Sequence, residues 1–266
     1  RLQNKVALVN KGERLTYQEV DEKSNKVAQE LRSRGIQRGD RVAIFLDNSI
    51  ESVVSLFGIL KADAVFLMLS SLLKPTKLGY ILNNCQAKAL VTHTNKLNII
   101  SGTIPAVPSL DFVVFVGEEE KIRQTNMPKP IPWNEIDGFT SPKASRPAPS
   151  KNIDVDLATI IYTSGSTGNP KGVMLTHLNM ISAATSITTY LENVAEDIII
   201  DVLPLSFDYG LYQVLMAFKF GGTIVLEQSF TYPYEIIKKM VKERVTGFPG
   251  VPTMFAILLQ MEDLKK

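Results

Sequence analysis

The chain has 266 residues, of which 45% are hydrophobic and 21% are charged, and its formal net charge is +2. This composition predicts a globular protein with one large or two medium domains, and it argues against a nucleic-acid binder that concentrates basic charge. The single cysteine, Cys85, excludes an internal disulfide and fits the reducing cytoplasm, and no Cys/His cluster has the spacing of a zinc site.

Apolar strands and amphipathic helices alternate over the first 116 residues. Thr16 and Glu19 have the spacing of a capping box at the start of the first helix. The expected strands cover residues 5–10, 41–46, 64–69, 88–92 and 111–116, and the expected helices cover residues 15–35, 49–61 and 74–85. Lys61 and Asp63 interrupt the longest apolar run, which therefore favours a helix followed by a strand over a transmembrane segment.

The alternation stops between residues 117 and 152 and then resumes. This stretch is rich in Pro, Ser and charge, so we expect a long polar surface connection, with Trp133 as an anchor. The later strands are expected at 157–163, 172–176, 197–204 and 222–226, with helices near 179–191, 210–219 and 233–244 and a last one to the end. The interpretation is an α/β fold of layered sheets flanked by helices, with a first subdomain (1–116), a Pro-rich connection (117–152) and a second α/β segment (153–266).

The string "YTSGSTGNPKG", residues 162–172, suggests an anion site. Its glycines let backbone N–H groups turn toward a ligand, its hydroxyls add donors, and Lys171 adds a positive charge suited to phosphate. The order Pro170-Lys171-Gly172, followed by a β-prone run, excludes a Walker P-loop, and the spacing is not that of a dinucleotide fold. The alternative is a plain flexible loop between two strands.

The string "YTSGSTGNPKGVMLTH" resembles the signature of the AMP-forming adenylating enzymes, namely acyl-CoA synthetases, adenylation domains of nonribosomal peptide synthetases and firefly luciferase. Other segments resemble further family motifs in the same order: "LTYQEV" (15–20), residues 58–92, "PLSFDYG" (204–210) and "GFPGVPTMFAILL" (247–259). The resemblance covers nearly the whole chain, and we take an acyl-CoA ligase as its nearest type. It implies the fold of the large N-terminal domain of acyl-CoA synthetases, in incomplete form.

The chain departs from the family pattern in length and at two places in sequence. Asp63 stands where the family usually has Gly, and residues 68–71 replace a Pro-Leu-Asp/Asn-like string; we expect local packing variation at both. Family members are roughly twice as long, and their adenine and ribose motifs, hinge and C-terminal domain do not occur here. We therefore expect an N-terminal portion that lacks ligase turnover by itself.

The resemblance implies ATP-dependent adenylation of a carboxylic acid with release of pyrophosphate, followed by thioester formation with coenzyme A. It assigns the β- and γ-phosphates to the loop, in which Thr163 and Lys171 are the expected catalytic residues and Thr163 is also placed near Mg²⁺. The implied ATP-binding residues are Thr163, Ser164, Gly165, Ser166, Thr167, Gly168 and Lys171.

The resemblance also implies a substrate pocket lined by Phe207, Asp208 and Tyr212. In family members that activate amino acids, an aspartate after phenylalanine pairs with the substrate ammonium. The alternative for Asp208 is a cap on the helix that begins near Tyr209, and Tyr212 either lines the pocket or packs. We interpret His177 as structural, because a carboxylic acid is already ionised at neutral pH and needs no base.

Three functional hypotheses stay open at this point. The first is an acyl-CoA ligase of fatty acid metabolism, cytoplasmic, acting on a small-molecule carboxylic acid. The second is an amino-acid-activating adenylation domain that loads the phosphopantetheine of an acyl or peptidyl carrier protein. The third is a non-catalytic nucleotide-binding remnant. We expect neither a nucleic-acid partner nor a transmembrane segment.

Overall fold

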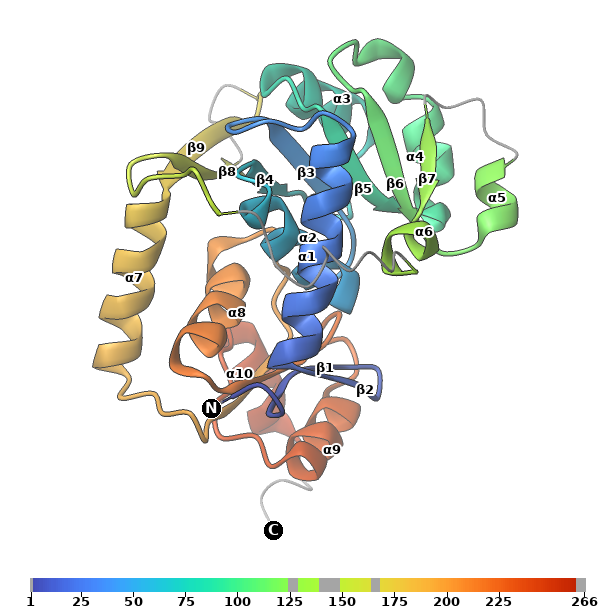
Figure 1. Ribbon diagram of the computed structural model, residues 1–266. Coiled ribbons are helices and arrows are strands. Elements are labelled where there is room, and N and C mark those ends of the chain that lie inside the picture. The colour runs from blue at the N-terminus through green and yellow to red at the C-terminus, as the bar shows by residue number, and fades with distance from the viewer. Residues whose placement is uncertain (1, 124–128, 139–148, 164–167, 262–266) are drawn as a thin grey trace. The chain divides into compact units, whose positions relative to one another are not determined.

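The computed structural model describes residues 2–123, 129–138, 149–163 and 168–261 (Figure 1). The chain forms two compact units. The smaller unit comprises residues 1–20, 48–50 and 183–266, and the larger unit comprises residues 21–47 and 51–182. These units differ from the segments expected from the sequence, because the strand at the start of the chain pairs with a strand more than 200 residues later.

The larger unit is built on a seven-stranded sheet with the order β7-β6-β5-β3-β4-β8-β9. Its strands are β3 (Arg41–Phe45), β4 (Val65–Met68), β5 (Ala89–His93), β6 (Phe112–Val116), β7 (Pro130–Pro132), β8 (Leu157–Thr163) and β9 (Lys171–Thr176). All neighbours are parallel except β8 and β9, which are antiparallel. The expected parallel α/β architecture is confirmed for this unit.

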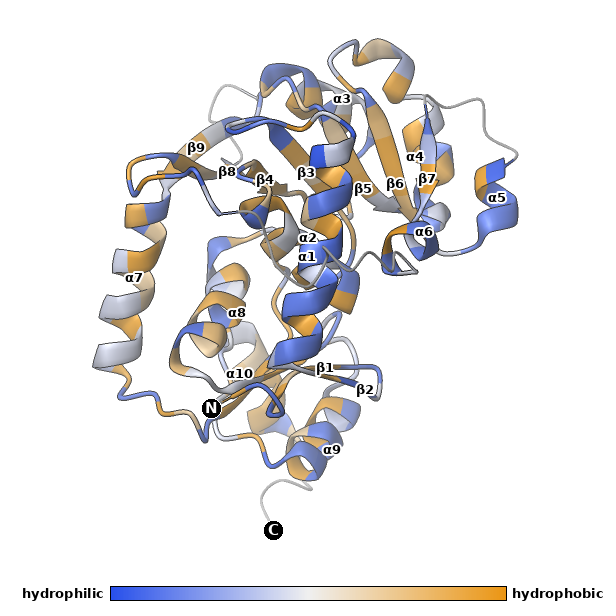
Figure 2. Cartoon of the chain, viewed as in Figure 1, coloured by the Kyte–Doolittle hydropathy of each residue, from blue (hydrophilic) through white to orange (hydrophobic). Residues whose placement is uncertain are grey.

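Helices of the larger unit pack on a sheet whose strands are apolar (Figure 2). They are α1 (Tyr17–Ser33), α2 (Ile50–Lys61), α3 (Pro75–Asn84) and α4 (Leu97–Ser101), with the 3-10 turns η1 (Thr94–Lys96) and η2 (Ile104–Ala106). Phe45, Leu67 and Leu90 lie on three strands and belong to one buried cluster with Leu78 and Ile81 of α3. Strands that are buried on both faces have nearly continuous apolar sequences, and this explains why their positions could be predicted from the sequence.

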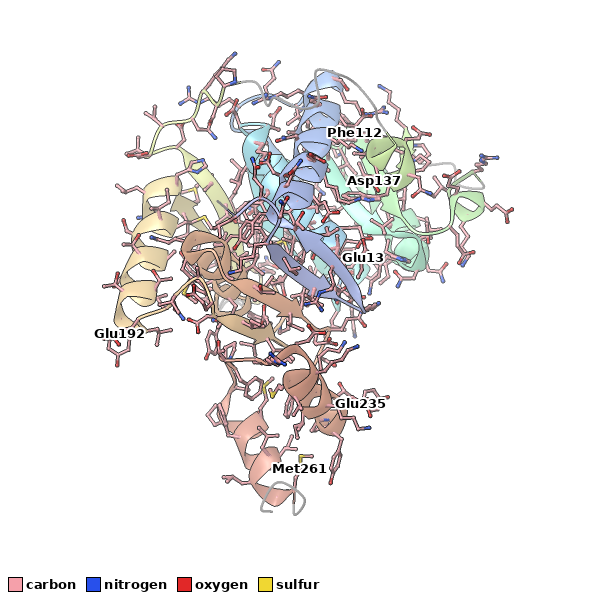
Figure 3. All side chains as sticks on the ribbon, turned by 60° about the horizontal axis from the view of Figure 1, so that its bottom comes forward. Glu13, Phe112, Asp137, Glu192, Glu235 and Met261 are labelled. Atoms are coloured by element: carbon pink, nitrogen blue, oxygen red, sulfur yellow. The ribbon has the colours of Figure 1, made fainter. Side chains whose placement is uncertain are left out.

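The polar connection contains regular structure that the sequence did not predict. It forms α5 (Glu119–Arg123), the edge strand β7 and α6 (Trp133–Asp137), and Ile122, Ile131 and Ile136 are buried there whereas Trp133 is only half-buried. Asp137 (labelled in Figure 3) forms an ion pair of 2.7 Å with Lys23 of α1. Elements of three to five residues are too short to display a period, and this explains the omission.

The smaller unit has a four-stranded sheet with the order β10-β11-β1-β2. Its strands are β1 (Val6–Asn10), β2 (Glu13–Thr16), β10 (Ile198–Asp201) and β11 (Thr223–Leu226), and its helices are α8 (Asp208–Phe220), α9 (Pro233–Glu243) and α10 (Pro252–Gln260). Helix α7 (His177–Tyr190) starts in the larger unit and ends in the smaller one. Strands β10, β11 and β1 are parallel, so their carboxyl ends lie at one edge.

Strand β2 occupies residues that the sequence assigned to the start of a helix. It returns antiparallel to β1 through Lys11 and Gly12, both at positive φ, which is the backbone conformation of a tight hairpin turn. The expected capping box of Thr16 and Glu19 is confirmed at the start of α1. Thr16 N donates to Glu19 Oε2 at 2.7 Å, and Glu19 N donates to Thr16 Oγ1 at 3.2 Å.

Asp63, one of the two departures from the family pattern, occupies a left-handed turn with φ of 63°. Its buried carboxylate pairs with Arg32 Nη2 at 2.9 Å and accepts from Ser150 Oγ at 2.6 Å. Glycine suits this backbone conformation best, whereas aspartate adds two charge-assisted contacts. The departure is therefore a local structural substitution within the larger unit, as expected.

Candidate active site

The glycine-rich loop joins two antiparallel strands at the edge of the larger sheet. Strand β8 ends at Thr163 and β9 begins at Lys171, and these two residues are Cα partners in the ladder. The predicted strand-to-strand placement, which separates this loop from Walker-type loops, is confirmed. Four of the predicted ATP-binding residues, Ser164, Gly165, Ser166 and Thr167, lie outside the described residues.

The side chains at the neck of this hairpin are exposed to solvent. Thr163 Oγ1 lies 3.5 Å from the carbonyl oxygen of Lys171, a long contact that leaves the hydroxyl available to a ligand. The Lys171 ammonium makes no ion pair with any residue in the described part of the chain. Gly168, also exposed, has a φ of 90°, which favours glycine. The neck thus presents a hydroxyl, a cation and a glycine turn together.

Packing below the neck fixes where these groups lie. Tyr162 Oη donates to Asn84 Oδ1, at the end of α3, at 2.6 Å. Burial raises the pKa of the Tyr162 phenol, so it stays protonated as a donor. A Cβ at Gly172 would lie 2.7 Å from Ile160 Cγ2 and 3.2 Å from Tyr162 Cζ, so only glycine fits there. No spacing or composition in the sequence indicated the contact of Asn84 or the packing role of Gly172.

The three predicted pocket residues lie at the start of α8, in the smaller unit. Phe207 is the N-cap residue and is 61% exposed, and Asp208 is exposed in the first turn. Asp208 Oδ1 accepts a hydrogen bond from Tyr209 N at 2.8 Å. One carboxylate oxygen is therefore used in the helix start, while Oδ2 accepts no hydrogen bond from a described residue and is available to a ligand.

Tyr212 lies one helical turn after Asp208 and is half-buried. Burial, and then the neighbouring Asp208 carboxylate, raise the pKa of its phenol. The spacing of four residues places Asp208 and Tyr212 on the same side of α8.

Two buried polar side chains hold the loop that leads into α8. This β10–α8 loop comprises residues 202–207. Asp201 is fully buried, its Oδ1 accepts from Leu203 N at 3.0 Å, and its Oδ2 has no hydrogen-bond partner among the described residues. Burial raises the pKa of Asp201 to about 8. Asn48 contacts the same loop through its side-chain amide. The sequence offered no signal for either role.

The remaining titratable candidates have structural roles. His177 Nε2 lies 3.2 Å from Asn152 Nδ2, and His93 Nδ1 accepts from Asn95 N at 3.0 Å. Burial raises the pKa of the Cys85 thiol to about 11, which makes it a poor nucleophile. Among the residues that the structure describes, no three His, Cys, Asp or Glu side chains are grouped as metal ligands, and no helix combines the length and apolarity that crossing a bilayer requires.

Comparison with known proteins agrees with this geometry. The sequence profile of the AMP-binding enzyme family matches residues 1–266. The chain belongs to this family. It is 30% identical to zwittermicin A synthase ZmaJ of Bacillus cereus over 99% of its own length and 46% of that protein. It is 27% identical to a long-chain-fatty-acid–CoA ligase of Bacillus subtilis (strain 168), over its whole length and 50% of the ligase.

The fold also matches solved structures of CoA ligases. The crystal structure of the anthranilate CoA ligase AuaEII in complex with anthranoyl-AMP superposes with a TM-score of 0.88 at 25% identity, covering 98% of this chain and 49% of that one. The expected fold, that of the N-terminal domain of acyl-CoA ligases, is confirmed. The chain spans about half the length of each of these three proteins.

Proposed function

We propose that the full-length protein activates a carboxylic acid with ATP as the acyl-adenylate, releases pyrophosphate, and transfers the acyl group to coenzyme A. Membership of the AMP-binding family supports the adenylation step. The structural observation that carries the proposal is the hairpin neck, where Thr163 and Lys171 are ladder partners below a glycine- and hydroxyl-rich loop.

The chemistry of Thr163, Lys171 and the loop between them suits the binding of a polyphosphate. The exposed Lys171 ammonium would neutralise charge on the β- and γ-phosphates as pyrophosphate leaves. We assign the intervening loop residues, including Ser164 and Thr167, to the same phosphates. The Thr163 hydroxyl offers one oxygen to Mg²⁺, and this suits a metal held mainly by substrate phosphates and water. Bound Mg²⁺ would supply further neutralisation of phosphate charge.

The chain's own residues have little covalent work in such a reaction. The acid is ionised at neutral pH and attacks the α-phosphate directly, so the protein has to align the two substrates and stabilise the developing charge. No general base is required, in keeping with the contact of His177 to Asn152. We assign Phe207 and Tyr212 to the wall of the acid pocket.

A second candidate is an adenylation domain that activates an amino acid and loads a carrier-protein phosphopantetheine. The observation that favours it is Asp208, whose carboxylate is exposed and uses only one oxygen in the helix start. The other oxygen can pair with a substrate ammonium. The two candidates differ in acid and acceptor, whereas the phosphate chemistry is shared.

ATP–pyrophosphate exchange by the full-length protein tests the shared chemistry, with a panel of fatty, aryl and amino acids. Transfer to coenzyme A and to a phosphopantetheinylated carrier protein then separates the candidates. We expect exchange with a fatty or aryl acid and transfer to coenzyme A. Since the chain spans 50% of the Bacillus subtilis ligase, we also expect these 266 residues alone to show no acyl-CoA formation.

A further inference from the structure

We propose that Asn48 is a positioning residue that holds the β10–α8 loop, so that Phe207 and Asp208 are presented correctly to the acid substrate. The inference rests on the proposed function, which assigns these two residues to the acid pocket. All the residues that carry it belong to the smaller unit.

Asn48 is 6% exposed, and both its side-chain nitrogen and its side-chain oxygen are hydrogen-bonded. Its Nδ2 donates to Leu203 O at 2.8 Å and to Glu227 O at 2.9 Å. Its Oδ1 accepts from Leu205 N at 3.1 Å. Because Glu227 directly follows β11, the amide ties the β10–α8 loop to the end of the neighbouring strand. An asparagine side chain can donate two bonds and accept at the same time, which a hydrophobic residue of similar size cannot do.

Asp201 contacts the same loop from the end of β10. Its Oδ1 accepts a hydrogen bond from Leu203 N at 3.0 Å. The backbone N–H of Leu203 is therefore bonded to Asp201, and the backbone carbonyl of Leu203 is bonded to Asn48. Leu203 and Leu205 are 6% and 2% exposed, so the bonded peptide groups have no water to replace these partners. Loss of the Asn48 amide would leave several buried backbone groups unpaired and would shift the loop.

A shift of the loop must reach the pocket residues. A Cβ on Gly210 of α8 would lie 2.6 Å from Pro204 O, so the first turn of the helix packs directly on the loop backbone. Phe207 N also donates to Pro204 O at 3.1 Å, and Leu211 N donates to Phe207 O at 3.0 Å. Backbone contacts of this kind have no flexible side chain between them to absorb a displacement. The positions of Phe207 and Asp208 therefore depend on Asn48.

Asn10, in the sheet of the smaller unit, provides a matched control. It is also 6% exposed and lies at the carboxyl end of β1, and its Nδ2 donates to Leu226 O at 2.7 Å. Among the described residues its side chain makes no hydrogen bond to the β10–α8 loop. Asn10→Ala therefore removes a buried amide from the same edge without removing support from the loop.

The test compares the N48A and N10A variants of the full-length protein in ATP–pyrophosphate exchange, at a temperature where both are folded. The proposal predicts that N48A raises the KM for the acid by about tenfold or more while the KM for ATP stays within about twofold. N10A should leave the ratio of the two KM values unchanged. If N48A does not fold, N48S, whose uncharged hydroxyl is too short to make all three hydrogen bonds of the amide, replaces it.

Hydrogen exchange of the Leu205 amide separates this proposal from the proposed function. Failure of the wild-type protein to exchange with any acid overturns the proposed function and, with it, the catalytic consequence drawn here. The Leu205 amide would still be expected to lose protection in N48A, by about tenfold relative to N10A. Unchanged Leu205 protection, or an acid KM within about twofold of wild type in N48A, overturns the positioning role.

Discussion

Thr163 and Lys171 are Cα partners in the last pair of the β8–β9 ladder, although they are eight positions apart in the sequence. Antiparallel pairing brings a hydroxyl and an ammonium to the same end of the sheet edge, and the hydrogen bond from Tyr162 to Asn84 holds this end of the hairpin in place. The larger unit therefore carries its candidate phosphate-binding groups on a rigid pair of strands, which is the arrangement that positions charge best.

Replacing Lys171 with alanine should weaken catalysis and leave folding intact. The side chain is exposed and makes no ion pair with a described residue, so its removal should change the free energy of unfolding by less than about 0.5 kcal/mol. Loss of a cation that stabilises developing phosphate charge should lower kcat of ATP–pyrophosphate exchange by about 100-fold. The measurements are exchange kinetics and urea unfolding.

The control for this variant is Lys242→Ala, which removes an exposed lysine from α9. K242A should retain the exchange rate within about twofold. A K171A protein with a normal exchange rate would remove Lys171 from the phosphate site. Collapse of its stability would instead assign the residue a structural role.

Gly172→Ala should destabilise the hairpin. The added Cβ would lie 2.7 Å from Ile160 Cγ2 and 3.2 Å from Tyr162 Cζ, and a contact of this kind in a packed region costs about 1–3 kcal/mol. Gly102→Ala is the matched change in the larger unit, because its added methyl group would meet no atom within 4 Å among the described residues beyond its chain neighbours, and its φ is −80°. Urea unfolding midpoints of the two variants decide the point; equal midpoints would contradict the packing role of Gly172.

Asp208→Asn separates a role in the first turn of α8 from substrate recognition. Phe207 is the N-cap residue, so Asp208 contributes to the helix start through its charge and its contact to Tyr209 N, and both D208N and D208A should change the free energy of unfolding by less than about 1 kcal/mol. If the substrate is a fatty or aryl acid, D208N should leave its KM within about threefold. A KM raised about tenfold for an α-amino acid would favour the carrier-loading candidate instead.

Asp201→Asn should stabilise the protein increasingly as the pH rises. Burial raises the pKa of Asp201 to about 8, whereas an unfolded aspartate has a pKa near 3.9. Between these values the unfolded chain has released this proton and the folded chain retains it, so the wild-type group loses stability as pH rises, by up to about 1.4 kcal/mol per pH unit. The asparagine does not titrate.

The difference in unfolding free energy between D201N and wild type should therefore grow from about pH 4 to pH 8 and stay constant above pH 8. Other titrating groups cancel in this difference. Urea unfolding at four pH values across the window measures it. A difference that does not change with pH would mean that Asp201 has an ordinary pKa in the folded protein.

The sequence predicted what depends on local pattern. The hairpin around Thr163 and Lys171 and the capping box at Thr16 follow from residues that are close in the chain. The contacts of Asn48 with the β10–α8 loop span 155 positions or more and involve backbone atoms of apolar residues, so no spacing or composition indicates them. Asp63 departs from the family pattern in sequence, but its left-handed φ and its ion pair with Arg32 are visible only in the structure.

ATP–pyrophosphate exchange by the full-length protein, with fatty, aryl and amino acids supplied separately, tests adenylation most directly. The account predicts acid-dependent exchange with at least one class, lost on replacement of Lys171 and retained on replacement of Lys242. Absence of exchange with every acid class, in a folded full-length protein supplied with ATP and Mg²⁺, would contradict it.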